Sequence, residues 1–365
     1  MRVVTILGTR PEIIRLSLII KKLDAHAESH VLVHTGQNFT PSLSDIFFRE
    51  LRLRQPDYRL GEGRETLGGQ LSVMFAEVER ILTAHRPDVV LLLGDTNSAL
   101  CAIIAERMGI PVVHMEAGNR CYDLSVPEEK NRRVIDAIST INMPYTAYSK
   151  GNLLREGFPS NRIMQSGNPI HEVILHYKHD IEASDILTRL GVAAGNYMLV
   201  TAHRAENVDR PERLMSILEG LNGVAERFGK RLICSIHPRT RSRIQAGHIK
   251  VAMDARVELH EPLGFFDFVQ LERHACCAIT DSGTVQEECC LFGVPTVTIR
   301  ETTERPETVD CGSNVVCGLK AARIVEAVAV MTGLPASWQI PEGYSAEDVS
   351  DKVVKYVLGG KWDVY

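Results

Sequence analysis

Short apolar runs alternate with longer amphipathic stretches along the whole chain. In the first half, each run is strand-sized, and the segment after it has apolar residues at helical spacing. Continuous apolar strands that alternate with helices indicate a parallel sheet covered on both faces. The strands predicted here are 2–7, 31–34, 89–93 and 112–115, and the helices are 12–25, 66–84, 98–108 and 129–139.

The same alternation restarts after Gly167-Asn168-Pro169, a stretch in which helices tend to stop. The strands predicted after it are 197–201, 232–236, 257–259, 278–280 and 296–299, with helices such as 212–228 and 284–292 between them. We therefore predict two doubly wound α/β domains, 1–168 and 169–345, with a cleft between them. The last segment, about 346–365, holds an amphipathic stretch at 346–358 and is expected to pack back on the first domain.

Composition narrows the class of protein. The chain has 365 residues, of which 44% are hydrophobic and 24% charged, as in a globular protein with large cores rather than a disordered one. Lys and Arg total 41 against 46 Asp and Glu, so the net charge is −5. This charge excludes the positive electrostatic potential that a general nucleic-acid binder needs. No apolar run approaches the roughly 20 residues that span a membrane. The start shows no signal-peptide pattern, so we expect no membrane association and a cytoplasmic location.

The nine cysteines form no C-x-x-C pair, and several lie in apolar segments. Buried reduced thiols explain this pattern better than a metal or redox site. No metal is expected.

The loop at 8–12, GTRPE, follows the first predicted strand. In open parallel sheets ligands bind beyond the carboxyl ends of the strands, so polar residues in such loops are candidates for a site. Gly8 permits a tight turn, Pro11 suits a first helical turn, and Arg10 would project into the cleft. Because the G-x-G-x-x-G pattern of dinucleotide-binding folds is missing, Arg10 is a candidate for a phosphate or for an ion pair between the domains. A solvated arginine at a helix start would also explain the segment.

The strongest phosphate-binding signal lies at 280–284, TDSGT, where a predicted strand ends and a helix begins. Ser282 or Asp281 can cap this helix, and Gly283 lets a ligand approach the N–H groups at the positive end of the helix dipole. A diphosphate fits there, although capping alone would explain the serine.

Charged residues downstream extend this signal. Glu287 and Glu288 follow one turn later and could accept hydrogen bonds from ribose hydroxyls. Arg300 and Arg305 follow the strand at 296–299, and an arginine there could bind a pyrophosphate with two hydrogen bonds.

Carboxylates cluster after strands of the first domain. Asp95 follows 89–93, Glu116 follows 112–115, and Glu128 and Glu129 open the next helix. Acids at such positions could do acid–base work. The alternative is that Asp95 caps a helix and the glutamates sit in a favourable first turn.

Two histidines end neighbouring strands of the second domain. His203 with Arg204 follows 197–201, and His237 with Arg239 follows 232–236. The repeated pairing favours an anion site, where His203 could act as a general acid or donate to a phosphate oxygen. Metal binding is disfavoured because no carboxylate or cysteine lies at zinc-like spacing.

Taken in order, these segments resemble the non-hydrolysing UDP-N-acetylglucosamine 2-epimerases. The matching stretches are GTRPE at 8–12, TGQN at 35–38, GDTNS at 94–98, HMEAG at 114–118, PEEKNRR at 127–133, TAHRAEN at 201–207, DSGTVQEE at 281–288 and TTERPE at 302–307. The resemblance implies two Rossmann-like domains of the GT-B architecture with the active site in the interdomain cleft. It also implies no cofactor and a homodimer.

The resemblance also implies the site residues. Those for substrate binding are Arg10, Arg15, Phe268, Ser282, Gly283, Thr284, Glu288 and Arg305, and those for chemistry are Asp95, Glu116, Glu128 and His203. By the same resemblance, Ser282, Gly283, Thr284 and Glu288 hold diphosphate and ribose, Phe268 lies near the uracil, and Arg10 and Arg305 neutralise the diphosphate.

The implied reaction removes UDP from C1 and the proton from C2, giving a 2-acetamidoglucal, and then adds both back with the opposite configuration at C2. The C2 hydrogen lies next to no carbonyl, so loss of UDP must first build positive charge at C1. Cations are needed for the leaving diphosphate and more than one acid–base group for the two faces, which suits three carboxylates. Such an enzyme would interconvert UDP-GlcNAc and UDP-ManNAc for surface polysaccharide synthesis.

The chain departs from the family at several positions. Arg15 stands where a lysine is frequent, and Asn38 where a histidine is frequent, so a second, activating substrate site is not carried over. The loop at 119–123 is closer to a branch that acts on related UDP-N-acetylhexosamines, such as precursors of UDP-N-acetyl-L-fucosamine. Epimerisation of a related sugar, glycosyl transfer and catalytically silent UDP-sugar sensing remain alternatives.

Overall fold

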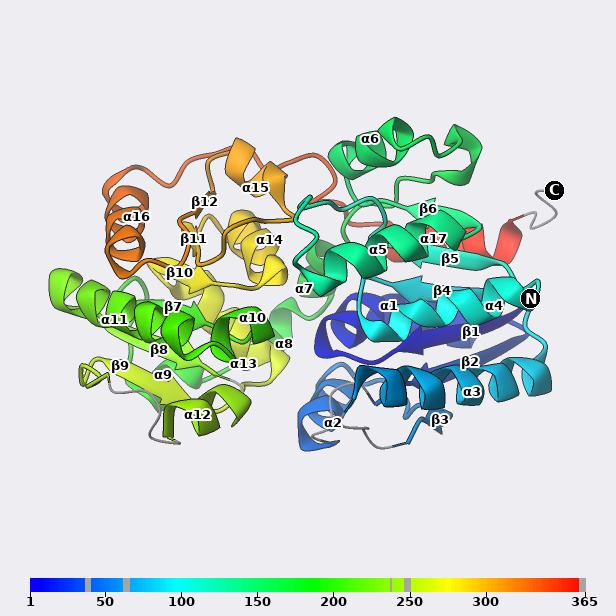
Figure 1. Cartoon of the computed structure of the whole chain (residues 1–365), viewed down its shortest axis with the longest axis horizontal. Helices are drawn as coiled ribbons and strands as arrows, with labels where there is room; N and C mark the ends of the chain where they lie inside the picture. The colour runs from blue at the N-terminus through cyan, green and yellow to red at the C-terminus, as the bar shows by residue number, and fades with distance from the viewer. Residues whose placement is uncertain (37–40, 62–65, 237, 246–250, 361–365) are drawn as a thin grey trace. The chain divides into compact units, whose positions relative to one another are not determined.

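The computed structural model describes residues 1–36, 41–61, 66–236, 238–245 and 251–360 (Figure 1). The chain forms two compact units, unit 1 with Met1–His176 and Glu342–Tyr365, and unit 2 with Tyr177–Pro341. The predicted boundary near residue 168 lies before helix α7 (Ile170–His176), which belongs to unit 1 because it packs on α1 (Arg10–His26) and buries Ile170 and Val173.

Unit 1 is built on a six-stranded parallel sheet. Its strands are β1 (Arg2–Leu7), β2 (Ser29–His34), β3 (Tyr58–Arg59), β4 (Val89–Leu93), β5 (Val112–Met115) and β6 (Ile141–Met143), in the order β3-β2-β1-β4-β5-β6. Its other elements are α2 (Pro41–Glu50), α3 (Leu67–His85), η1 (Asn97–Cys101), α4 (Ala102–Arg107), α5 (Pro127–Ile138), α6 (Ala147–Arg155), η2 (Ser160–Arg162) and α17 (Val349–Gly359), besides α1 and α7.

Unit 2 repeats this topology. Its strands are β7 (Tyr197–Thr201), β8 (Arg231–Ser235), β9 (Val257–His260), β10 (Cys277–Thr280), β11 (Thr296–Thr298) and β12 (Asn314–Val316), all parallel, in the order β12-β11-β10-β7-β8-β9. Its helices are α8 (Lys178–Glu182), α9 (Ile186–Leu190), α10 (Ala205–Val208), α11 (Pro211–Phe228), α12 (Pro238–Gln245), α13 (Phe265–His274), α14 (Gly283–Phe292), α15 (Pro306–Asp310) and α16 (Ala321–Gly333).

Both sheets change winding direction at one place. In unit 1 this is the junction of β1 and β4, and in unit 2 it is the junction of β7 and β10. At such a junction the connections leave in opposite directions, which opens a crevice beyond the carboxyl ends of the strands where ligands bind. The α/β fold of parallel sheets is therefore confirmed, and its geometry selects the loops after these four strands.

The central strands are apolar throughout because helices cover both faces of each sheet. Every residue of β4 is buried, and Val90 packs with Val78 of α3 and Ile135 of α5. In unit 2, Val200 of β7 packs in one cluster with Leu218 of α11 and Ile324 of α16. All nine cysteines are described as thiols, and six of them are buried.

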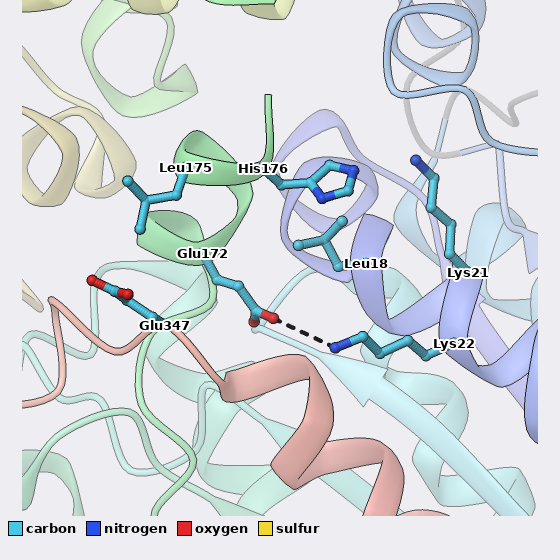
Figure 2. A pocket seen from close by; sticks show the side chains of 7 residues that line it. All are labelled: Leu18, Lys21, Lys22, Glu172, Leu175, His176 and Glu347. Atoms are coloured by element: carbon cyan, nitrogen blue, oxygen red, sulfur yellow. Dashed lines mark ion pairs between the residues drawn. The ribbon is translucent and has the colours of Figure 1, made fainter. Parts of the chain in front are cut away.

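Helix α17 closes unit 1 and packs on α1. Val353 and Val357 are fully buried, and Lys22 Nζ lies 2.6 Å from Asp351 Oδ1. Glu172 accepts a 2.7 Å hydrogen bond from the Ser350 N–H. Figure 2 shows Glu172 of α7 directed towards Lys22 of α1 beside a pocket of about 350 Å³. Helix α17 thus belongs to unit 1 together with the N-terminal helix α1.

None of the helices in the described ranges is long and apolar enough to cross a membrane.

Candidate active site

Four of the site residues predicted from sequence lie in the loops that the topology selects. In unit 1, Arg10 opens α1 directly after β1, and Asp95 follows β4. In unit 2, His203 follows β7, and Ser282 is the N-cap of α14 after β10. Each pair of loops flanks the switch point of its own sheet.

Asp95 is held by an arginine that the sequence analysis did not identify. Arg132 of α5, 2% exposed, donates to Asp95 Oδ2 from Nε at 3.1 Å and also from Nη2. Its Nη1 donates to Glu129 Oε2 at 2.6 Å. The three side chains form an ion triad across 37 residues of sequence. The i,i+3 spacing of Glu129 and Arg132 was the one feature of the local sequence that could have predicted part of this triad.

The two neighbouring glutamates at the start of α5 have different surroundings. Burial by itself would raise the pKa of Glu129, but the hydrogen bond from the Cys121 N–H and the charge of Arg132 outweigh it and lower that pKa. Glu129 is therefore a buried structural anion. Glu128 is half-buried in the first turn of the same helix.

Glu116 lies in a tight turn after β5. Its φ is +66°, in the left-handed region that non-glycine residues rarely adopt, and strain of this kind concentrates at functional sites. Its carboxylate accepts hydrogen bonds of 3.4 Å from Asn119 Nδ2 and from the Tyr145 hydroxyl. Arg15 Nη1 lies 3.9 Å from Glu116 Oε2. The structure thus joins Glu116 with Arg15, two residues predicted separately.

A buried network connects the Asp95 loop to the Glu116 turn. The His114 ring lies 2.9 Å from Asp136 Oδ1 through Nδ1 and 2.8 Å from the Gly94 carbonyl through Nε2. The Gly118 N–H donates to Asp136 Oδ2 at 3.1 Å. Burial would raise the pKa of Asp136, but His114 and Arg120 lower it. Asp136 and Arg120 were missed because nothing local marks them as neighbours of both loops.

Glu12 makes a second link at the switch point of unit 1. Its Oε2 accepts the N–H groups of Gly8 at 2.5 Å and Thr9 at 2.7 Å, and its Oε1 accepts the Thr96 hydroxyl at 2.6 Å. Burial raises the pKa of Glu12 to about 7, against these hydrogen bonds. Arg10 is half-buried, with its guanidinium 5.8 Å from the centre of the Phe47 ring.

The start of α14 carries the predicted diphosphate residues. Ser282 makes no side-chain cap, and its hydroxyl instead lies 3.0 Å from that of Thr284. A Cβ on Gly283 would lie 2.7 Å from Glu304 Oε1, so that carboxylate lies close to the backbone at the helix start. The N–H groups at the start of a helix favour an anion.

The arginines of unit 2 are paired with carboxylates. Arg305 is buried and donates from Nε to Glu287. Glu304 accepts from Arg300 Nη1 at 2.7 Å and from Arg204 Nη2 at 3.1 Å. These acids hold the guanidinium groups in place. The sequence analysis did not predict these ion pairs.

Two other predicted residues of unit 2 are buried. Glu288 is 6% exposed in α14. Phe268 of α13 is 8% exposed and packs in an apolar cluster with Leu199 and Val285.

Asp281, treated in the sequence analysis as a possible cap, organises the loop that carries His203. Its fully buried carboxylate accepts the N–H groups of His203 and Arg204 at 3.0 Å each. His203 Nδ1 lies 3.4 Å from Asp281 Oδ1, and the ring is 41% exposed. This contact orients the histidine. His237, predicted as a second histidine, lies outside the described residues, as does Asn38.

No group of three or more His, Cys, Asp or Glu side chains within the described ranges is arranged to hold a metal ion. The polar groups present suit proton transfer and anion binding.

Comparison with known proteins gives consistent matches. The profile of a family described as UDP-N-acetylglucosamine 2-epimerase matches residues 21–358. The UDP-N-acetylglucosamine 2-epimerase of Methanocaldococcus jannaschii is 39% identical, with 99% of this chain and 100% of that protein covered. A crystal structure of the M. jannaschii UDP-GlcNAc 2-epimerase in complex with UDP-GlcNAc and UDP is similar with a TM-score of 0.93, at 39% identity over 99% and 100% of the two chains. The UDP-2,3-diacetamido-2,3-dideoxy-D-glucuronate 2-epimerase of Pseudomonas aeruginosa is 35% identical over 91% of this chain and 93% of that protein.

Proposed function

Because the chain belongs to the UDP-N-acetylglucosamine 2-epimerase family of isomerases, we propose that it interconverts UDP-GlcNAc and UDP-ManNAc without releasing free sugar. The structural observation that supports this most is the ion pair between Asp95 and Arg132 at the carboxyl end of β4. This ion pair supports the proposal because Asp95, an acid–base candidate of the family motif, is held next to the switch point of the sheet.

The proposed reaction has two half-steps. In the first, the C1–O bond to UDP breaks with its electron pair on the diphosphate, and a base takes the C2 proton to leave 2-acetamidoglucal. In the second, a proton reaches C2 from the opposite face and the diphosphate oxygen adds to C1. Atoms and charge balance, so no cofactor is needed.

Unit 2 is proposed to bind the nucleotide. The N–H groups at the start of α14, with Ser282, Gly283 and Thr284, would bind the diphosphate, helped by Arg305. Because Glu287 already pairs with Arg305, the net positive charge there is small and the diphosphate can leave and return. Glu288 would accept ribose hydroxyls, and Phe268 would lie on the uracil side.

Unit 1 is proposed to carry the acid–base chemistry. Asp95, Glu116 and Glu128 would exchange the C2 proton and stabilise positive charge at C1. Arg10 and Arg15 would contact the diphosphate from this unit, and His203 of unit 2 would donate from Nε2 to the leaving oxygen.

Proton NMR in D2O tests the reaction. Incubation with UDP-GlcNAc should give UDP-ManNAc with deuterium at C2 of both recovered sugars. Epimerisation without deuterium would exclude the proton-transfer mechanism. Free N-acetylmannosamine would indicate hydrolysis, and a product that forms only with an acceptor would indicate a glycosyltransferase.

Replacing the acids one at a time tests their assignment. Asp95→Asn, Glu116→Gln and Glu128→Gln should each lower kcat by about 100-fold or more. UDP affinity, measured by calorimetry, should stay within about threefold because none of the three carboxylates is proposed to contact UDP. Glu77→Gln on the exposed face of α3 is the matched control. Rates like the wild type in all three variants would remove the acid–base assignment.

A related UDP-N-acetylhexosamine is the second candidate substrate, favoured by the similarity to the P. aeruginosa 2-epimerase. A panel of UDP-N-acetylhexosamines, compared by kcat/KM, separates the two candidates. The gluco substrate should react at least tenfold better than the others if the first proposal holds.

We also propose a cytoplasmic homodimer, in line with the family resemblance. Light scattering after size-exclusion chromatography should give twice the chain mass, and a monomer would contradict it.

A further inference from the structure

Glu12 joins two loops that are far apart in the sequence. It lies in the first turn of α1, 2% exposed, and its carboxylate accepts N–H groups of the loop after β1 and the hydroxyl of Thr96 in the loop after β4. The Thr96 bond spans 84 residues. Because β1 and β4 are parallel neighbours, both loops leave the same edge of the sheet.

The bond to Thr96 goes beyond helix capping. The N–H groups of Gly8 and Thr9 precede or open α1, so a glutamate at this position can satisfy them as part of an ordinary cap. Thr96 belongs to another loop and contributes nothing to capping α1. It does, however, directly follow Asp95, and Arg10 lies two residues before Glu12.

The surroundings leave the two loops little room to move. A Cβ on Gly8 would lie 2.2 Å from both Ser98 Oγ and Thr35 Oγ1, and these hydroxyls are 2.7 Å apart. The loops after β1, β2 and β4 are therefore interlocked. Asp95 is held on its other side by Arg132, so its loop is fixed from two directions.

We propose that Glu12, through its hydrogen bond to Thr96, is a positioning residue that sets Asp95 relative to Arg10. This inference rests on the proposed function, in which the carboxylate and the arginine act on one substrate. A misplacement of a reacting group by about 1 Å can lower a rate by about 100-fold. Loss of the link should therefore reduce kcat more than substrate affinity.

A double-mutant cycle on the full chain tests the link. Glu12→Gln and Thr96→Val should each lower kcat for UDP-GlcNAc epimerisation by about tenfold or more, with KM and the Kd of UDP changed by less than about threefold. The double variant should be no slower than the slower single variant, because both changes act on the same link between Glu12 and Thr96. Thr96→Ser, which keeps the hydroxyl, should retain most of the wild-type kcat.

A matched control is available in the same unit. The Thr140 hydroxyl donates to Glu106 Oε1 at 2.7 Å, just before β6 and thus at the amino edge of the sheet. Thr140→Val removes a bond of the same kind and should leave kcat within about twofold.

The outcomes separate the inference from the proposed function. If the wild type exchanges the C2 proton but Thr96→Val has an unchanged kcat, Glu12 only caps its helix and the inference is wrong. Additive losses in the double variant would also overturn it. If the wild type shows no exchange with any UDP-N-acetylhexosamine, the proposed function itself fails. Should Glu12→Gln not fold, Thr96→Val and Thr96→Ser still decide the matter.

Discussion

At the scale of single residues, buried charges at the edge of the unit 1 sheet are held by partners distant in sequence. Arg132 joins Asp95 to Glu129, and Glu12 joins Thr96 to the loop after β1. A buried charge is tolerated only when its partners remain in place. Side chains of this kind should therefore respond strongly to substitution or to a change of pH.

Arg132→Leu should show the cost of removing one such partner. It removes the buried cation of Glu129 and leaves the more exposed Arg133 beside that carboxylate, so unfolding should be easier by about 3–5 kcal/mol, and kcat should fall because Asp95 loses its support. Arg133→Leu is the matched control, since Arg133 contacts the same glutamate from a position that is 39% exposed. Thermal unfolding and initial rates measure both effects. Equal losses in the two variants would contradict the role given to Arg132.

Glu12 should make stability depend on pH. Its pKa is about 7 in the folded protein and 4.5 as an ordinary glutamate, so between these values the folded state binds more protons than the unfolded state. The free energy of unfolding must then fall as pH rises from 4.5 to 7, by about 3 kcal/mol from this group. Glu12→Gln lacks this contribution. The difference in unfolding temperature between the variant and the wild type should therefore change over this range, and a constant difference would refute the assignment.

At the scale of elements, tight turns place the acids at the ends of the strands. The turn after β5 contains Glu116 at φ +66° and Gly118 at φ +78°. It also packs closely on α6, since a Cβ on Gly118 would lie 2.3 Å from the Ser149 carbonyl oxygen. Both the backbone conformation and the contact require glycine there.

Comparing Gly109 with Gly118 separates the effect of the left-handed backbone from the effect of the close contact. Gly109 has φ +74° with open space around it, so Gly109→Ala should cost only the roughly 1–2 kcal/mol of a left-handed alanine. Gly118→Ala should cost clearly more and should also lower kcat, because α6 must shift. Urea unfolding monitored by circular dichroism compares them. Similar losses would show that the contact with Ser149 carries no weight.

At the scale of the whole molecule, unit 1 is built from both ends of the chain. Helix α17 returns after unit 2 and buries Val353 and Val357. The fold of unit 1, which carries the proposed acids, therefore depends on a helix that follows unit 2 in the sequence.

Val353→Asp should disrupt unit 1 selectively. A buried, unpaired carboxylate on α17 should destabilise that unit and abolish epimerisation. The residues of unit 2 proposed to bind UDP should still bind it, more weakly because the contacts of Arg10 and Arg15 are lost. Lys355→Asp, on the exposed face of the same helix, is the control. Limited proteolysis and UDP calorimetry report on the two units. Loss of UDP binding together with activity would show that the units do not fold separately.

The local pattern of the sequence determined much of the architecture. Strands β1, β4, β5 and β7 have the predicted bounds because buried parallel strands are apolar without interruption. The edge strands β3, β6 and β12 have two or three residues each, too few to give a periodic signal, and they were missed. The loops with Asp95, Glu116, His203 and Ser282 were found because the carboxyl ends of such strands can be read directly from the sequence.

Only the tertiary structure decided which residues these loops pair with. The pairing of Asp95 with Arg132, of Arg305 with Glu287, of His203 with Asp281 and of Glu12 with Thr96 joins segments between 18 and 84 residues apart. Propensity and hydrophobic period act over a few residues, whereas an ion pair depends on where the whole sheet brings its loops. The sequence by itself determined which groups stand at the carboxyl ends of the strands, and the tertiary structure decided which charged groups pair with one another.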